Sequence, residues 1–528
     1  MIKQRYMPTR SRPLSFTRFL VLAILAALSG CASDALNLAP AAPDTPWKPA
    51  PQDTASSENT SGKLDMPLGF SVPVVPEASV LPAAPVINPG RVYGLPELID
   101  IAQQENPDTR LAWNRARQAA LAVGVVDSTF LPRLSANVIS GWQKTHTPLP
   151  LLPGNHSINT EMHGVVPALA LEWLIFDFGQ RKAIAEGARQ ASFAANVLFN
   201  GSHQKIIHDV THAYYQYGGA HSQTVVAAQA LKNAHQIARA VEGRRKAGLA
   251  TVLETAQANQ QVAQAKLRQV TAQGNQQIAY QALLAAVGLP ATMDIKISPP
   301  PKHALPGTNS TLTDEAIRMA ISRRPDVLAS YAAMKASAQG ITAAKAEFLP
   351  KVYLGAVAAR SHTNFDVRGL PSLSQQTGSS SVILGVTIPI FDGGLRSARL
   401  QDARIQAASA ADVFQKSQQA AMREMIAASD MLRTALASYQ AASELVRTAK
   451  TTYDGALEAY RHGLGTLTAV TMADTALLDA QQARMDARTA SQAAAANLAF
   501  VMGDMTTARE SWVGQDVLTR PGLAGDFQ

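Results

Sequence analysis

A long internal repeat constrains this chain more than any other feature. The stretch LEWLIFDFGQRKA, Leu171 to Ala183, returns 215 residues later as VTIPIFDGGLRSA, Val386 to Ala398. Each copy is an alternating apolar segment that runs into Phe-Asp and then a glycine. This pattern predicts a strand that ends in a turn, followed directly by a helix.

Other matching residues hold the same spacing along the chain. The PD and FLP motifs at 107–108 and 130–132 return at 325–326 and 348–350, an offset of 218. The glycines of two later turns, Gly248 and Gly463, match at an offset of 215. The change of offset places a loop-sized deletion between the FLP and FDxG motifs. Because the register holds over so many positions, we interpret the chain as a tandem duplication.

The aspartate and glycine of each FDxG motif are predicted to form strand–helix junctions. A carboxylate there can accept hydrogen bonds from the free amides of the first helical turn and complement the helix dipole. The junction residues are Asp177, Gly179, Asp392 and Gly394. A catalytic acid is the alternative, but no partner carboxylate, histidine or nucleophile recurs beside both copies.

Composition favours helices and argues against nucleic-acid binding. Aromatic residues make up only 6% of the 528 residues, and long tracts are rich in Ala, Gln, Ser and Arg, which suits helices packed through small side chains. The formal net charge is +8, but the first thirty residues hold five Lys or Arg and no acid. No basic stripe interleaved with aromatic residues is present, so nucleic acid is not an expected partner.

Residues 1–30 are predicted to be a signal peptide. A basic start leads into the apolar run Phe19 to Leu28, which is too short to span a bilayer. The run ends in Leu-Ser-Gly-Cys31, which resembles the lipobox of bacterial lipoproteins, and Cys31 is the only cysteine. We therefore predict that Cys31 carries lipid such as palmitate. An ordinary signal peptide with a spare thiol is the alternative. Ala32 implies, by the same resemblance, sorting to the outer membrane.

Residues 31–92 are predicted to be an extended, lipid-anchored linker. They hold eleven of the thirty prolines, separated mainly by Ala, Ser and Thr. Such a composition favours an extended chain over a packed helix.

Four strands are expected, near residues 132–142, 164–176, 350–359 and 382–390. In the first, Leu134, Ala136 and Val138 alternate with polar residues, the period of a strand with one apolar face. A loop over 143–163 contains prolines and the histidines His146, His156 and His163. Histidines can bind metal, but no cysteine or carboxylate lies at ligand spacing, so a solvated loop is the preferred interpretation and no metal is expected.

Two long proline-free windows predict paired helices. A helix over 95–128, interrupted at Pro107, precedes the first two strands. The windows then accommodate outgoing helices over 178–247 and 393–462 and return helices over 251–287 and 466–502. In the second window a residue recurs every seven positions, which predicts a coiled-coil seam: Met425, Leu432, Tyr439, Val446, Tyr453 and Tyr460. The matching residues of the first window are weaker, namely Val210, Tyr217, Leu231 and Ala238.

The turns between outgoing and return helices are short and glycine-rich. Their residues are Gly248, Leu249 and Thr251 in the first copy and Gly463, Leu464 and Thr466 in the second. The glycine suits the left-handed position after a helix, and Thr251 with Glu254 has the spacing of a capping box. The leucine of each turn either packs across its own hairpin or contacts a partner.

Four strands in one chain would leave two open edges, which a bilayer does not tolerate. The smallest membrane barrels have about eight strands. Oligomerisation must therefore close the sheet, and three copies with twelve strands is the natural solution. The expected chain is mainly α-helical, with long coiled-coil helices and four strands in two tandem copies.

Taken together, the FLP and FDxG junctions, the GLxT turns and the tandem halves resemble the TolC family of outer-membrane channels. The resemblance covers about residues 93–510, divided into repeats at 93–305 and 306–510, with a C-terminal tail at 511–528. The lipobox and the proline-rich segment make the chain similar to the lipoprotein subgroup of that family.

The resemblance implies a homotrimer with a twelve-stranded outer-membrane β-barrel and a twelve-helix periplasmic α-barrel. It implies a passive exit duct of a tripartite efflux system, with the turns meeting a periplasmic adaptor that links to an inner-membrane transporter. Family members often carry aspartates shortly after the second turn, where this chain has Ala469 and Met472. The nearest acids, Glu254 and Asp474, are the candidates for the pore entrance.

Two other functions remain open at this point. The chain could export a polypeptide as the outer-membrane part of type I secretion, or be a periplasmic coiled-coil scaffold tethered by lipid. An enzyme is the least favoured class, because no nucleophile and base, metal spacing or phosphate loop is found. No cofactor is expected, and the substrate and class of pump are not determined.

Overall fold

The computed structural model describes residues 90–505 with gaps at 149–156, 302–304, 306–312 and 368–370, and a few short stretches before residue 90. The predicted signal peptide, Cys31, nearly all of the linker and the C-terminal tail lie outside the described residues. The chain divides into Met1–Ala84 and Pro85–Gln528. In the first unit, Pro76–Ser79 forms a short 3-10 helix, η2. All that follows concerns the second unit.

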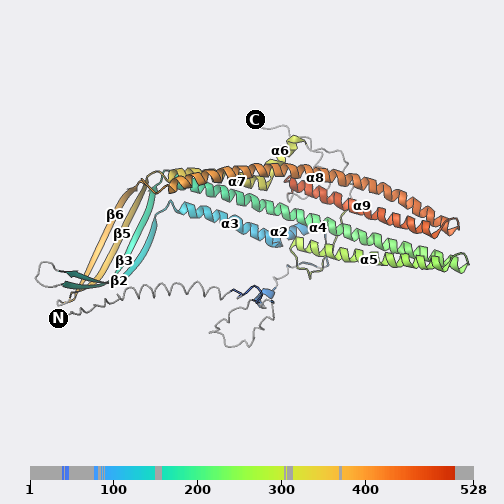
Figure 1. Cartoon of the computed structure of the whole chain (residues 1–528), viewed down its shortest axis with the longest axis horizontal. Helices are drawn as coiled ribbons and strands as arrows, with labels where there is room; N and C mark the ends of the chain where they lie inside the picture. Colours follow the sequence, from blue (N-terminus) through green and yellow to red (C-terminus); the bar gives the residue numbers. More distant parts are fainter. Residues whose placement is uncertain are drawn as a thin grey trace, which may run out of the picture. The chain divides into compact units, whose positions relative to one another are not determined.

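The predicted helical hairpins are present in both copies (Figure 1). In the first copy α4 (Gln180–Lys246) is followed by α5 (Val252–Val287), and in the second α8 (Leu395–Arg461) is followed by α9 (Leu467–Val501). Among these described residues, α4 and α8 are each 67 residues long. The predicted bounds are thus confirmed to within two residues at each end.

Shorter helices precede the strands of each copy. Helices α2 (Leu95–Glu105) and α3 (Pro107–Ser128) confirm the predicted break at Pro107. Their equivalents are α6 (Asp314–Arg323) and α7 (Pro325–Ala346). Proline occupies the first turn of α3 and α7, where its missing N–H costs nothing. Within the described part of the chain, no helix combines the length and hydropathy needed to cross a membrane.

The four expected strands form one antiparallel sheet in the order β2-β3-β5-β6. They are β2 (Arg133–Pro148), β3 (Ser157–Phe176), β5 (Lys351–Val367) and β6 (Leu373–Thr387). All four are longer than predicted, and the loop expected over 143–163 is wrong, because most of it pairs as strand from Gln143↔Met162 to Pro148↔Ser157. Ladder hydrogen bonds outweigh the weak β-propensity of this polar segment. Strands β2 and β6 are the edges of the sheet.

A second, small sheet joins the start of the first copy to the segment between the copies. Strand β1 (Val92–Tyr93) pairs in parallel with β4 (Lys296–Ile297). Tyr214 of α4 donates its hydroxyl to the backbone oxygen of Ser298 beside it, at 2.9 Å. The segment that connects α5 to the second copy, here called the crossover, is thereby fixed to the middle of α4.

The helices pack side by side, and α4 of the first copy joins the two copies by contacting helices of both. Helix α4 contacts α3 and α5 of its own copy and α7 and α9 of the other, while α8 contacts α7 and α9. A core near the turns draws on all four long helices, including Ile237, Ala258, Tyr453 and Val470. The interfaces contain many buried alanines, which accounts for the Ala-rich composition.

The heptad prediction is confirmed in the second copy, whereas in the first copy Val210 is buried as predicted and the later positions are shifted. Of the six α8 positions, only Tyr439 is not buried. In α4 the buried positions are one residue earlier than the predicted Leu231 and Ala238 and repeat at steps of three and four: Ala227, Ala230, Ala234, Ile237 and Val241. Small alanines allow the closer helix approach, whereas the larger Leu231 is only partly buried.

Two adjacent glycines, Gly218 and Gly219, lie inside α4 without interrupting it. A Cβ at Gly218 would lie 2.3 Å from the ring of Pro300, and one at Gly219 would lie 2.4 Å from Oγ1 of Thr489 in α9. The glycines therefore let the crossover and α9 approach the α4 backbone, which the sequence alone did not reveal.

Candidate functional site

Each hairpin ends in a tight turn, and the two turns are here called the tips, Gly248–Thr251 and Gly463–Thr466. Gly248 has φ 76° and Gly463 has φ 78°, the left-handed conformation that favours glycine. The amide of the following leucine donates to the carbonyl five residues earlier, at 2.8 Å in both copies. This pair of identical turns ends both outgoing helices in the same way.

The return helices begin with threonine caps. The Thr251 hydroxyl accepts from the amide of Glu254, and the Glu254 carboxylate accepts from the amide of Thr251 at 2.7 Å. The predicted capping box is thus confirmed. In the second tip, Thr466 accepts from the amide of Ala469 without a returning carboxylate. The carboxylate of Glu254 caps the start of α5, and its assignment to a pore entrance stays a prediction.

The tip leucines are solvent-exposed in the single chain. Leu249 is 66% exposed and Leu464 is 87% exposed, whereas Leu467, three residues after the second leucine, is buried. Neither leucine therefore packs firmly across its own hairpin. Val252 and Leu253 are also exposed beside the first tip, so the tips present apolar side chains to water.

Arg244 links the two tips, a contact that the sequence did not suggest. Its Nη1 donates to the backbone oxygen of Tyr460 at 2.9 Å and its Nη2 to that of Leu249 at 3.3 Å. The guanidinium also lies over the Tyr460 ring, 4.9 Å from its centroid. The equivalent residue in the second copy is Ala459, so the repeat gave no signal, and the two tips are held by one asymmetric bridge.

Asp474 does not stand free at the tip. It lies on α9 and accepts a hydrogen bond from Nδ2 of Asn233 on α4 at 3.1 Å. Burial raises the pKa of this carboxyl above its ordinary value. Burial, followed by the nearby Asp474 and Asp454, raises the pKa of Tyr453 to about 12. Asp474 thus joins the two hairpins through this hydrogen bond, and its assignment to a pore entrance stays a prediction.

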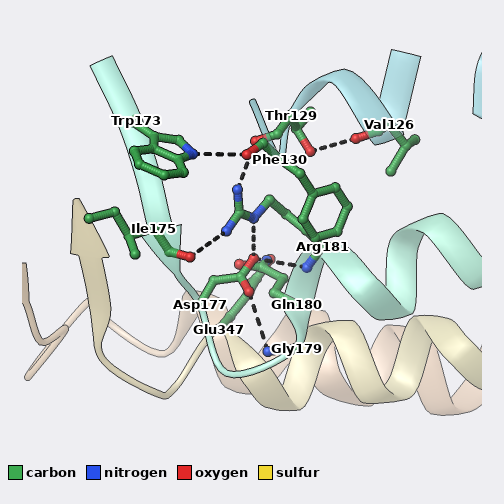
Figure 2. Close-up of polar contacts among 10 residues, drawn as sticks. All are labelled: Val126, Thr129, Phe130, Trp173, Ile175, Asp177, Gly179, Gln180, Arg181 and Glu347. Atoms are coloured by element: carbon green, nitrogen blue, oxygen red, sulfur yellow. Dashed lines mark hydrogen bonds and ion pairs between the residues drawn. The ribbon is translucent and has the colours of Figure 1, made fainter. Parts of the chain in front are cut away.

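The first strand–helix junction is a buried ion pair (Figure 2). Nε of Arg181 lies 2.8 Å from Oδ2 of Asp177, and both residues are buried. The Asp177 carboxylate also accepts from the amides of Gly179 and Arg181. The helix N-cap is Gly179 itself, so the aspartate acts from two residues further upstream than a cap residue, and the prediction is corrected in that detail.

Arg181 also explains why the FLP motif recurs. Its Nη1 donates to the backbone oxygen of Thr129 at 2.7 Å, and its guanidinium lies over the Phe130 ring at 4.8 Å. Trp173 of β3 donates its indole N–H to the backbone oxygen of Phe130 at 2.8 Å. One arginine therefore ties the end of α3 to the end of β3 and the start of α4, as Figure 2 shows.

The second junction has the same arrangement, but its ion pair is more exposed to solvent than the first. The side chains of Asp392 and Arg396 form the same ion pair, with 27% and 11% of their surface exposed. Arg396 donates to the backbone oxygen of Pro389 and lies over Phe348. Hydrogen bonding from Arg396 lowers the pKa of Asp392. Gly394 occupies the left-handed N-cap position, with φ 92°.

Two of the three histidines of the predicted loop lie in the described part of the chain. His146 and His163 lie on neighbouring strands, and Nδ1 of His163 is 3.9 Å from the Asp366 carboxylate. His156 lies outside the described residues. Over the parts of the chain that the structure describes, no group of three or more His, Cys, Asp or Glu could hold a metal ion.

The chain matches one family model. The model is described as "Outer membrane efflux protein", and it matches residues 98–289 and 316–504. These two segments contain α3 to α5 and α7 to α9, together with the four strands between them.

Individual relatives agree with this match. Outer membrane protein OprJ of Pseudomonas aeruginosa is 29% identical over 348 residues, covering 64% of this chain and 70% of OprJ. The probable outer membrane lipoprotein SilC of Salmonella typhimurium is 26% identical over 354 residues, covering 65% of this chain and 72% of SilC. The structure is similar to that of the outer membrane protein VceC from Vibrio cholerae, with TM-score 0.64 and 21% identity over 78% of this chain and 96% of VceC.

Proposed function

Because this chain belongs to the outer membrane efflux protein family, we propose that it is the outer-membrane exit duct of a tripartite efflux system. Substrates would pass from an inner-membrane pump and a periplasmic adaptor through the duct to the cell exterior. The duct works passively and carries out no covalent chemistry. The observation that carries the proposal is the layer of long paired helices that joins a four-stranded sheet to two exposed apolar tips.

The two faces of the sheet support its insertion into a membrane. Leu134, Leu171, Ala356 and Val382 lie opposite one another across the four strands and share one face. On the other face the neighbouring row is Ser135, Ala170, Val357 and Ser381. An apolar outer face and a more polar inner face are what a membrane β-barrel around a water-filled lumen requires.

The open edges support a homotrimer. Strands β2 and β6 each leave one row of backbone groups unpaired in the single chain, and an unpaired edge is not tolerated in lipid. Three copies would give a twelve-stranded barrel and, through the four long helices of each chain, a twelve-helix α-barrel in the periplasm. An exit duct in which both barrels share one axis follows from this arrangement.

The remaining assignments extend the proposal to the whole chain. Residues 1–30 are a signal peptide, 31–92 a linker anchored to the outer membrane through lipid on Cys31, and 511–528 a tail. Residues 93–305 and 306–510 are the two efflux repeats. The tips are the docking surface for the adaptor, with Thr251 and Thr466 fixing the backbone that presents the leucines.

The oligomeric state tests the proposed duct. We expect the full chain, extracted in mild detergent, to have the mass of three chains in multi-angle light scattering, and to conduct ions when inserted into a planar bilayer. A monodisperse monomer would contradict the proposal, because the strand edges would then lack partners. A trimer without conductance would contradict the open lumen.

Lipidation is tested at Cys31. We expect Cys31→Ser to leave an unprocessed precursor that incorporates no labelled palmitate, because the thiol that accepts the lipid is missing. The matched control Ser33→Ala should be processed and labelled like the unmodified chain. Normal maturation and labelling of Cys31→Ser would show that the residue is a spare thiol behind an ordinary signal peptide.

A further inference from the structure

Two histidines lie side by side on one face of α4. His208 and His212 are the only two histidines in the chain that are four residues apart, and residues at that spacing are neighbours on a helix surface. Their rings are stacked, with centroids 6.1 Å apart and planes inclined by 26°. The stretch reads His-Asp-Val-Thr-His, and two histidines at this spacing on a helix are a known arrangement of metal ligands.

Asp209 fixes which nitrogen of His208 is free. The Nδ1 atom of His208 lies 3.1 Å from Oδ1 of Asp209. Because an ionised carboxylate can only accept hydrogen bonds, Nδ1 carries the proton and the free lone pair lies on Nε2. Histidines that bind metals usually have such a partner on their second nitrogen, which fixes the tautomer and makes the ligand more basic. Asp209 is thus placed as a partner of His208 rather than as a third ligand.

The two histidines stand on a rigid backbone and have free ring nitrogens. Val210 lies between them and is fully buried. The ring of His208 packs against Phe500 of α9, with centroids 4.7 Å apart, and 18% of its side chain is exposed. His212 is exposed and forms no hydrogen bond or ion pair within the described residues. The His212 ring can therefore rotate toward an ion bound at Nε2 of His208.

The second copy shows that the fold does not require these histidines. At an offset of 215, His208 and His212 correspond to Arg423 and Ala427 of α8. Helices α4 and α8 nevertheless have the same length, 67 residues. The architecture that both copies share therefore does not explain the pair.

We propose that His208 and His212 bind a divalent transition-metal cation such as Cu²⁺, Zn²⁺ or Ni²⁺. Imidazole nitrogen suits these cations, whereas Mg²⁺ and Ca²⁺ prefer oxygen ligands. In the part of the chain that the structure describes, no group of three or more His, Cys, Asp or Glu could hold a metal ion. The pair therefore supplies two ligands and water completes the coordination, which leaves the ion exchangeable because only two bonds tie it to the protein.

A positive side chain near the pair is neutralised by a carboxylate. Lys205 lies one turn before Asp209 on α4 and forms an ion pair with it. Its charge therefore opposes a bound cation only weakly. We expect Lys205→Gln to tighten binding, because the Asp209 carboxylate would then keep its full charge beside the metal. Weaker binding in Lys205→Gln would contradict the proposed position of the ion.

The pair lies on the face of α4 that is turned away from the crossover. Tyr214 donates to Ser298 of the crossover, and His212, two residues earlier, projects about 200° away from it around the helix. Gln216, one turn after His212 on the same face, lines an open groove between α4, α5 and α9. An open lumen would place the crossover on the outside of the duct, so the metal site would face the lumen. This location, unlike the site itself, rests on the proposed function.

Copper alone is the probe that tests the site. The untagged full chain in detergent is titrated with Cu²⁺ and followed by electron paramagnetic resonance. We expect the first Cu²⁺ bound per chain to show hyperfine splitting from two nitrogen ligands. His208→Gln combined with His212→Gln should lose this signal, whereas the matched control on the same helix, His203→Gln with His235→Gln, should keep it. Asp209→Asn should weaken binding by about 10- to 100-fold.

The outcomes separate the metal site from the duct. An unmodified chain without a Cu²⁺ signal from two nitrogen ligands would overturn the site, as would a double variant that keeps the signal. Cu²⁺ bound by a monomer, or by a trimer that does not conduct, would support the site and overturn only its location in a lumen.

The unmodified chain also provides a test that does not depend on the double variant being folded. Diethyl pyrocarbonate modifies accessible histidines, and both His212 and His235 are exposed. We expect Cu²⁺ to slow the modification of His212 but not that of His235, measured by mass spectrometry of the peptides. Equal modification of His212 with and without Cu²⁺ would overturn the proposal.

Discussion

Replacing Arg181 with methionine is expected to lower the free energy of unfolding by about 3–5 kcal/mol. The change would remove one partner of a buried ion pair and leave the Asp177 carboxylate without its countercharge. It would also leave the backbone oxygens of Thr129 and Ile175 without their donors. The loss should appear as a lower midpoint in the thermal melt of the detergent-solubilised protein, followed by circular dichroism.

A surface arginine on the same helix provides the matched control. Arg189 pairs with Asp127, but both side chains are about half exposed, at 52% and 47%, and pairs of that kind contribute about 0–1 kcal/mol. Arg189→Met should therefore melt close to the unmodified chain. If Arg181→Met melts as Arg189→Met does, the junction is not what joins α3, β3 and α4.

The double variant Leu249→Asp, Leu464→Asp is expected to abolish efflux while leaving the protein folded, lipidated and trimeric. Both side chains are exposed in the single chain, so the change should not disturb the hairpins. If the tips form a water-excluding contact with an adaptor, each new carboxylate would be buried there without a partner. Each would cost roughly several kcal/mol of binding free energy. Substrate accumulation in cells and crosslinking to the adaptor are the measurements.

The conservative pair Leu249→Met, Leu464→Met serves as the control, since methionine keeps the apolar surface and should keep efflux. Trimeric mass and lipidation must be checked in both variants. Normal pumping by the aspartate variant would show that the tip leucines are not the docking surface. The exposed neighbours Val252 and Leu253 would then be the residues to examine.

Local sequence signals were sufficient for the helices and turns of this chain. Proline-free windows fixed the long helices, and glycine with threonine fixed the turns, because these residues act through their own backbone preferences and caps. The duplicated motifs located both strand–helix junctions. The strand ends were not predicted correctly, because residues 143–148 form strand only through pairing with β3. Such pairing is cooperative and is not encoded in a short stretch of sequence.

The roles of several charged residues depended on the tertiary structure. Glu254 and Asp474 looked alike in the sequence as acids near the tips, yet one closes a capping box and the other bonds to Asn233 on another helix. The Arg244 bridge between the tips was not visible, because its repeat equivalent is Ala459. Contacts between residues more than 200 positions apart leave no periodic trace in one sequence.

The sequence by itself therefore determined the duplicated architecture, the helix and turn positions and the family resemblance. Only the tertiary structure decided which faces of these helices are covered. It moved the later heptad positions of α4 by one residue, gave Gly218 and Gly219 a packing role and showed that α8 retains an open face. The physical reason is that helix propensity and capping act within a few residues, whereas burial depends on which distant helix packs against a face and how closely the two helices approach.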